Sequence, residues 1–252
     1  MGLKESGLRG SLRNVSVGID AIPDSGNLHA HYDAQQIDET DGETITVWND
    51  ESGNGYNATD GTQATYRESS LNGEPAVDFD GVDDLLTVPD STGEFTFLHD
   101  GSPASVYIVA EVQTPDSFDI IIDTGAGSTS QVGYGIFGDD GDGNIDWRVN
   151  NASDNIILTK GSRQTGDNLI ETHADQSSNP EAELFINESQ VDTDSYDNPS
   201  SEDSDFNFSI GGEEGGDRTL DCLLSEIMIY QTHHDSTTRG EVRSYLNNRW
   251  GR

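Results

Sequence analysis

The chain has 252 residues and a formal net charge of −36, because 48 Asp and Glu residues face 12 Lys and Arg residues. This balance excludes nucleic acid as a partner, since a phosphate backbone is bound by a basic surface. Apolar residues make up 31% of the chain and recur in short runs, which excludes an acidic polymer without a folded core. No run reaches the ~18 apolar residues of a membrane-spanning helix, so we expect no membrane insertion.

The density of negative charge also predicts an environment. Self-repulsion destabilises a compact state unless it is screened, and at about 1 M salt the Debye length falls to roughly 3 Å. Acidic residues are spread from Asp20 to Glu241 instead of forming a tail. We therefore interpret the chain as a protein of a hypersaline setting, with an acidic protein of an ordinary cell as the alternative.

Residues 1–26 are expected to form an arm that docks onto a partner. Basic residues outnumber acidic ones before Asp20, and glycines interrupt the apolar positions. Such a segment on an acidic protein is attracted to another acidic surface. The residues assigned to docking are Lys4, Leu8, Arg9, Leu12 and Arg13. A frayed terminus without a role is the alternative.

Residues 27–252 are predicted to form one domain of short strands separated by Gly, Asp, Asn and Ser clusters. The predicted strands are 28–34, 44–48, 76–79, 85–88, 95–98, 105–112, 118–123, 134–137, 145–149, 155–158, 169–174, 183–187, 206–210 and 222–230. Strands at this turn-rich spacing predict a sandwich of two antiparallel sheets.

One helix is predicted at 236–250, where apolar residues fall at helical spacing. Asp235 or Ser236 is the expected N-cap, and Gly251 is the expected stop. Basic residues gather in this part of the chain as they do in the arm: Arg239, Arg243, Arg249 and Arg252. We expect the helix to pack on the sandwich.

Two parts of the chain carry a resemblance to a known family. Residues 46–59, which read TVWNDESGNGYNAT, and residues 71–86, which read LNGEPAVDFDGVDDLL, resemble the opening half of a concanavalin A-like, laminin-G-like jelly roll. Residues 224–230, LSEIMIY, and residues 245–251, YLNNRWG, resemble its last strand and the helix that follows. The resemblance implies an all-β, two-sheet antiparallel jelly-roll sandwich with one C-terminal helix, and a sugar-binding or adhesion module.

Glycoside hydrolases of this fold imply a second possibility, because they place carboxylates at alternate positions of one strand in a Glu-x-Asp-x-x-Glu pattern. Glu181, Glu183 and Glu188 come nearest, but Phe185 stands where the middle Asp belongs. No Ser-His-Asp order is evident either. We expect the chain not to be an enzyme, with a glycan hydrolase as a lesser alternative.

An acidic loop predicts a calcium site. The ligands would be Asp139, Asp140, Asp142 and Asn144, since calcium prefers hard oxygen atoms in a flexible loop. The alternative is a hairpin loop turned by Asp-Gly pairs. A transition-metal site on a single strand, from His29, His31 and Asp33, is a weaker hypothesis. Ca²⁺ is the only cofactor we expect.

Sugar recognition is expected at the rim of the sandwich. Tyr134, Trp147 and Tyr196, with the polar loops 139–144 and 192–205, would supply a stacking face and hydrogen bonds. The alternative is that these aromatic side chains belong to the core.

The start of the chain lacks the apolar core of a secretory signal, and laminin-G-like modules resemble those in surface proteins of tailed viruses. These observations together predict a structural protein on the virion surface of a haloarchaeal tailed virus, as a capsid turret or spike or a tail fibre. Its partners would be other capsid or tail proteins, further copies of itself and a host-surface glycan. A cellular haloarchaeal adhesion or polysaccharide-binding module is the alternative.

Overall fold

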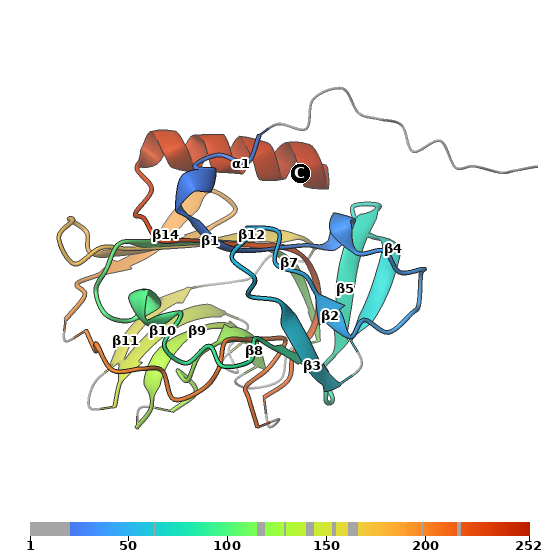
Figure 1. Ribbon diagram of the computed structural model, residues 1–252. Coiled ribbons are helices and arrows are strands. Elements are labelled where there is room, and N and C mark those ends of the chain that lie inside the picture. The colour runs from blue at the N-terminus through green and yellow to red at the C-terminus, as the bar shows by residue number, and fades with distance from the viewer. Residues whose placement is uncertain are drawn as a thin grey trace, which may run out of the picture.

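The computed structural model describes residues 21–62, 64–114, 119–128, 130–139, 144–152, 155–160, 166–197, 199–215 and 218–252. Within these residues the chain folds into two stacked antiparallel sheets, and one α-helix lies on the outer face of one sheet (Figure 1). The predicted all-β jelly-roll sandwich with a C-terminal helix is therefore confirmed.

Each sheet combines strands from distant parts of the chain. Sheet A has the order β14-β13-β12-β7-β16-β5-β4, and β1 also pairs with β16. Its strands are β1 (Leu28–Asp33), β4 (Thr65–Leu71), β5 (Glu74–Asp80), β7 (Ala104–Thr114), β12 (Asn168–Ala174), β13 (Ala182–Ile186), β14 (Ser189–Asp194) and β16 (Asp221–Tyr230). Sheet B has the order β11-β10-β9-β8-β15-β6-β3-β2. Its strands are β2 (Val47–Trp48), β3 (Ala58–Thr62), β6 (Leu85–Thr87), β8 (Asp119–Asp123), β9 (Val132–Asp139), β10 (Ile145–Asn151), β11 (Asn155–Lys160) and β15 (Ser209–Ile210).

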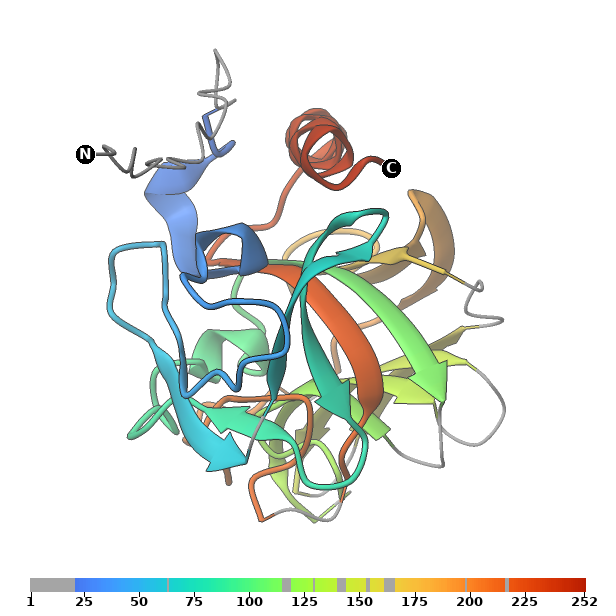
Figure 2. The same ribbon diagram turned by 90° about the vertical axis from the view of Figure 1, so that its right-hand side faces the viewer.

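The centre of sheet A is covered on both sides. One face packs against sheet B, and the other lies beneath α1 (Ser236–Trp250), which Figure 2 shows nearly end-on. Every residue of β12 is buried, and so are all residues of β16 after Asp221. A strand covered on both faces reads as a nearly continuous apolar run, because neither face meets water. Strand β16 follows this pattern apart from Ser225 and Glu226, whereas β12 also buries the polar residues Asn168, Glu171, Thr172 and His173. The side chains of Glu171 and Glu226 both bond to α1.

The boundaries of α1 match the predicted ones. The Asp235 side chain accepts hydrogen bonds from the amides of Thr237 (3.0 Å) and Thr238 (2.9 Å). Gly251 ends the helix with φ of 63°, and its amide donates to the Asn247 carbonyl. In the part of the chain that is described, no helix has the length and apolar character needed to cross a membrane.

The arginine side chains of α1, and that of Arg252 just after it, form ion pairs with carboxylates on and beside sheet A. The pairs are Arg239 with Glu183 (2.9 Å), Arg243 with Glu171 (3.0 Å), Arg249 with Glu226 (3.4 Å) and with Asp33, and Arg252 with Asp167 (2.5 Å). A buried carboxylate left without a partner destabilises a fold by several kcal/mol. The basic C-terminal segment thus neutralises the acid that the sheet buries beneath it.

Some predicted strands differ from the structure. Residues 95–98 form the 3₁₀ helix η3 (Thr96–Leu98) instead of a strand, and one tight turn there buries both Phe97 and Leu98. The sequence pattern also missed β3, β4 and β14. The side chains of β14 are exposed or half-buried, so this edge strand lacks a clear apolar alternation.

Candidate functional site

A cleft of about 610 Å³ opens where β1 begins. Its walls come from η1 (Ser25–Asn27), His29, the loop 52–56, the turn at Glu94 and Gln231. Polar side chains dominate this lining. These segments are far apart in the sequence and meet because β1 pairs with β16 and the loop between β2 and β3 folds against the start of β1.

One carboxylate fixes the shape of the loop. Asp50 Oδ1 accepts hydrogen bonds from the amides of His31 and Ser52, each at 2.9 Å. Asp50 Oδ2 accepts from the amides of Gly55 and Tyr56, each at 3.0 Å, and from the Ser52 hydroxyl at 2.8 Å. Hydrogen bonds to an ionised acceptor are stronger than neutral ones, so Asp50 sets the loop conformation before any ligand arrives.

Two further side chains tie the loop to β1. The Asn54 side-chain amide donates to the carbonyls of Leu28 (3.1 Å) and His29 (2.9 Å). The Ser52 hydroxyl lies 3.0 Å from the same His29 carbonyl. Gly55 has φ of 89°, in the left-handed region that glycine adopts without strain. The turn residues Ser52, Asn54 and Gly55 therefore act together to hold Tyr56 beside the start of β1.

Tyr56 forms the aromatic wall of the cleft. Its ring stacks on His29 with centroids 4.6 Å apart, and Phe95 and Phe97 pack edge-on against His29. The Tyr56 hydroxyl donates to Glu94 Oε2 at 2.7 Å. Burial, with Glu94 and Asp50 nearby, raises the pKa of Tyr56 to about 12, so the phenol remains a donor at neutral pH.

His29 is 8% exposed, and burial lowers its pKa, which Asp50 and Glu94 only partly offset. The imidazole is therefore neutral at pH 7. Among the described atoms, its Nε2 has no hydrogen-bond partner.

A bulge in β1 separates His29 from the residues expected beside it. Leu28 pairs with Tyr230 and Ala30 with Ile229, so His29 is the extra residue. It turns toward Tyr56, whereas His31 Nε2 lies 2.7 Å from Glu226 Oε1 beneath α1. The hypothesis of a transition-metal site from His29, His31 and Asp33 on one strand face is wrong for this reason.

The three aromatic residues predicted at the rim lie in the core. Tyr134, Trp147 and Tyr196 are each 1% exposed, so they offer no stacking face to a sugar. The Tyr134 hydroxyl lies 2.6 Å from Thr172 Oγ1, and the Tyr196 hydroxyl donates to the Leu98 carbonyl at 3.0 Å. Trp147 shares one face of β10 with Ile145 and Val149 and alternates with the charged Asp146 and Arg148, which is the sequence signal for an inward-facing position.

Two other predicted sites lie mostly outside the described residues. Asp140 and Asp142 belong to the part of the acidic loop that is not described; Asp139 ends β9, and Asn144 directly precedes β10. Calcium binding there stays a prediction. All five residues assigned to docking, Lys4, Leu8, Arg9, Leu12 and Arg13, also lie outside the described part of the chain.

The carboxylates considered for catalysis have structural partners. Glu183 pairs with Arg239, Glu181 accepts from the Tyr196 amide at 2.7 Å, and Glu188 accepts from the Asn247 side chain at 2.8 Å. These contacts hold α1 and the loop after β14 in place.

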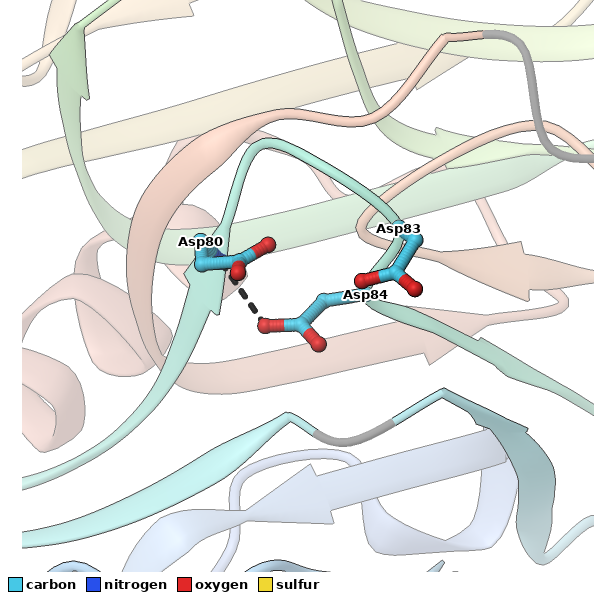
Figure 3. A group of neighbouring side chains, drawn as sticks. All are labelled: Asp80, Asp83 and Asp84. Carbon is cyan, nitrogen blue, oxygen red and sulfur yellow. Dashed lines mark hydrogen bonds between the residues drawn. The ribbon is translucent and has the colours of Figure 1, made fainter.

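In the described residues, one cluster of three acidic side chains has carboxylate oxygens that all lie within 4.8 Å of one another. These residues are Asp80, Asp83 and Asp84 (Figure 3). Asp84 Oδ2 accepts from the Asp80 amide at 2.8 Å, and Asp80 Oδ1 accepts from the Val82 amide at 2.8 Å. Burial and the neighbouring carboxylates raise the pKa of Asp84 to about 6. The hydrogen bonds account for this group as part of the turn at Gly81 between β5 and β6.

No family model and no curated protein matches the chain. Solved structures do match. Domain 4 of AbnA, a GH43 extracellular arabinanase from Geobacillus stearothermophilus in complex with arabinotriose, is 14% identical with a TM-score of 0.61, over 86% of this chain and 98% of that one. The binding domain of Paraclostridial Mosquitocidal Protein 1 is 16% identical with a TM-score of 0.63, over 88% of this chain and 53% of that one.

A Trypanosoma rangeli sialidase in complex with sialic acid is 13% identical with a TM-score of 0.58, over 91% of this chain. The match spans 34% of the sialidase. At these identities the likeness shows the fold. The chain therefore shares its β-sandwich architecture with the domains of these proteins.

Proposed function

We propose that the chain is a carbohydrate-binding β-sandwich module and that the cleft at Tyr56 is its binding site. The observation that carries this proposal is the contact between the Tyr56 ring and the exposed Glu94 carboxylate. The Tyr56 ring is half-buried and lies on a loop whose shape Asp50 fixes. A matching solved domain, that of AbnA, is in complex with arabinotriose, which supports the same use of the fold here.

The chemistry of the lining suits a sugar. The C–H face of a pyranose or furanose ring packs on an aromatic ring, and its hydroxyls pair with carboxylate and amide groups. Tyr56 supplies the ring, Glu94 supplies a carboxylate, and Gln231 adds an amide to the lining. The role is binding without catalysis, since the carboxylates of the Glu-x-Asp-x-x-Glu comparison bond to other parts of the fold.

Tyr56→Ala tests the proposal on an oligosaccharide array at high salt, followed by calorimetry on the sugars that bind. Loss of the ring should weaken binding about tenfold or more. Tyr56→Phe keeps the ring but loses the bond to Glu94, so its loss should be smaller. Val82→Ala is the matched control, because Val82 is 73% exposed and lies outside the cleft. Unchanged affinity in Tyr56→Ala would show that the cleft is not the binding site.

The finer proposal places this module on the surface of a haloarchaeal tailed virus, in several copies, with residues 1–26 as the anchoring arm and a host glycan as the target. The formal net charge of −36 and the basic residues of the arm support it. Mass spectrometry of particles purified at high salt tests it. Stoichiometric recovery with capsid or tail proteins is expected, and deletion of residues 1–20, which leaves the cleft wall at Ser25–Asn27 in place, should abolish it. Recovery on cells or in the medium instead would favour a cellular adhesin.

A further inference from the structure

The hydrogen-bonding groups of the cleft are unevenly divided between donors and acceptors. The amide donors of Asn54 are taken up by the carbonyls of Leu28 and His29. The Asn27 side chain donates to both oxygens of Asp24, at 2.9 and 3.1 Å. In both residues these contacts are made by the –NH₂ group, and the described contacts of the fold do not use the side-chain carbonyl oxygen.

Tyr56 and Glu94 follow the same pattern. The Tyr56 hydroxyl directs its proton to Glu94 Oε2, so the phenol is not a free donor. Glu94 is exposed and contributes carboxylate oxygens, which accept only. The remaining side-chain donors of the lining are the Gln231 amide and the Ser25 hydroxyl, and acceptors from Glu94, Asn27 and Asn54 outnumber them.

Positive charge is lacking as well. None of the described residues that line the cleft is Lys or Arg. His29, the remaining candidate cation, is neutral at pH 7 because burial lowers its pKa. Glu94 and the nearby Asp50 give the site a negative potential with no compensating group on its walls.

We propose that the cleft selects uncharged, hydroxyl-rich sugars and rejects sugars that carry a carboxylate, such as uronic and sialic acids. This inference rests on the proposed carbohydrate-binding function. The hydroxyls of a neutral sugar donate to Glu94 and to the carbonyl oxygens of Asn27 and Asn54. An acidic sugar brings a second carboxylate that finds no cation among the described lining residues and faces the Glu94 carboxylate.

The test uses an array of neutral oligosaccharides beside counterparts that each carry one uronic or sialic acid residue, with wild type, Glu94→Gln and Tyr56→Ala. At about 1 M salt the Debye length of roughly 3 Å screens the distant charges, so the remaining preference reports groups in contact with the sugar. Wild type should bind the neutral member of each pair at least about tenfold more tightly. Glu94→Gln should bring the two members to within about threefold, because one acceptor becomes a donor.

The outcomes separate the two proposals. Equal or tighter binding of acidic members by wild type, with Tyr56→Ala inactive, would overturn the selectivity and keep the sugar site. A neutral preference that Glu94→Gln leaves unchanged would assign the selectivity to the overall charge of the protein and overturn the role of the cleft. An array on which wild type binds no sugar would overturn the carbohydrate-binding function itself.

Discussion

The helix-covered face of sheet A and the cleft both contain polar side chains of the same strand, β1, but their carboxylates have different partners. Beneath α1, Glu171, Glu183 and Glu226 each pair with an arginine. In the cleft, the partner of Glu94 is the Tyr56 phenol, and no described lining residue is Lys or Arg. Arg239, Arg243 and Arg249 thus lie where carboxylates are buried, and the acceptors of the cleft stay open to a ligand.

The largest expected loss of stability comes from removing the Glu226 carboxylate, which lies beneath α1. Its carboxylate is fully buried and bonds to Trp250 Nε1 at 2.5 Å and His31 Nε2 at 2.7 Å. Glu226→Ala leaves Arg249 without this partner and should lower the free energy of unfolding by about 3–5 kcal/mol. Denaturant titration at high salt measures it. Glu241→Ala, at an exposed position of α1, should change stability by less than about 0.5 kcal/mol; similar values for the two variants would contradict a structural role for the buried charges.

In the cleft, the matching change removes the Asp50 carboxylate, which fixes the loop that carries Tyr56. Asp50→Ala removes the acceptor of four hydrogen bonds within the loop and one from the His31 amide of β1, and should lower the free energy of unfolding by about 3 kcal/mol. Sugar affinity should fall as far as in Tyr56→Ala, since Tyr56 is no longer held in place. Denaturation and calorimetry report the two effects. Glu51→Ala, its exposed neighbour, serves as control, and retained affinity in Asp50→Ala would show that the loop needs no such anchor.

Asp84 provides a third case, a buried carboxylate whose described partner is a backbone amide instead of an arginine. It is 3% exposed and accepts a hydrogen bond from the Asp80 amide. Its pKa is raised to about 6 in the folded protein, so the folded state binds the proton more tightly and stability falls as pH rises from about 4 to 6. Asp84→Asn should therefore be more stable than wild type by about 2 kcal/mol at pH 7, and the difference should vanish below about pH 4.

Thermal unfolding between pH 3.5 and 8 measures this difference, with the exposed Asp38→Asn as control. A wild type at least as stable as Asp84→Asn at pH 7 would show that the turn gains from the ionised carboxylate.

Much of the fold could be predicted from the sequence, because the signals that define it are local. The ends of α1 follow from Asp235 and Gly251, and the two-sheet sandwich follows from short apolar runs separated by turn residues. The edge strands β4 and β14 could not be predicted in this way, since an exposed edge imposes little apolar pattern.

The candidate site depended on contacts between distant residues. The turn residues of the loop 49–57 are visible in the sequence, but Tyr56 becomes a site residue through Glu94, 38 positions away. His29 joins it because a bulge turns one residue of β1 away from His31, and no local pattern predicts a bulge. The same alternation that predicts strands places Trp147 in the core, where the rim had been expected.

The sequence by itself determined the charge, the strand-rich pattern and the capped helix, because periodicity, turn residues and caps act within a few positions. The tertiary structure alone decided which carboxylates receive an arginine and which face the cleft. The physical reason is that burial and pairing depend on residues brought together by the sheets, such as Arg249 and Asp33, which are 216 positions apart in the chain.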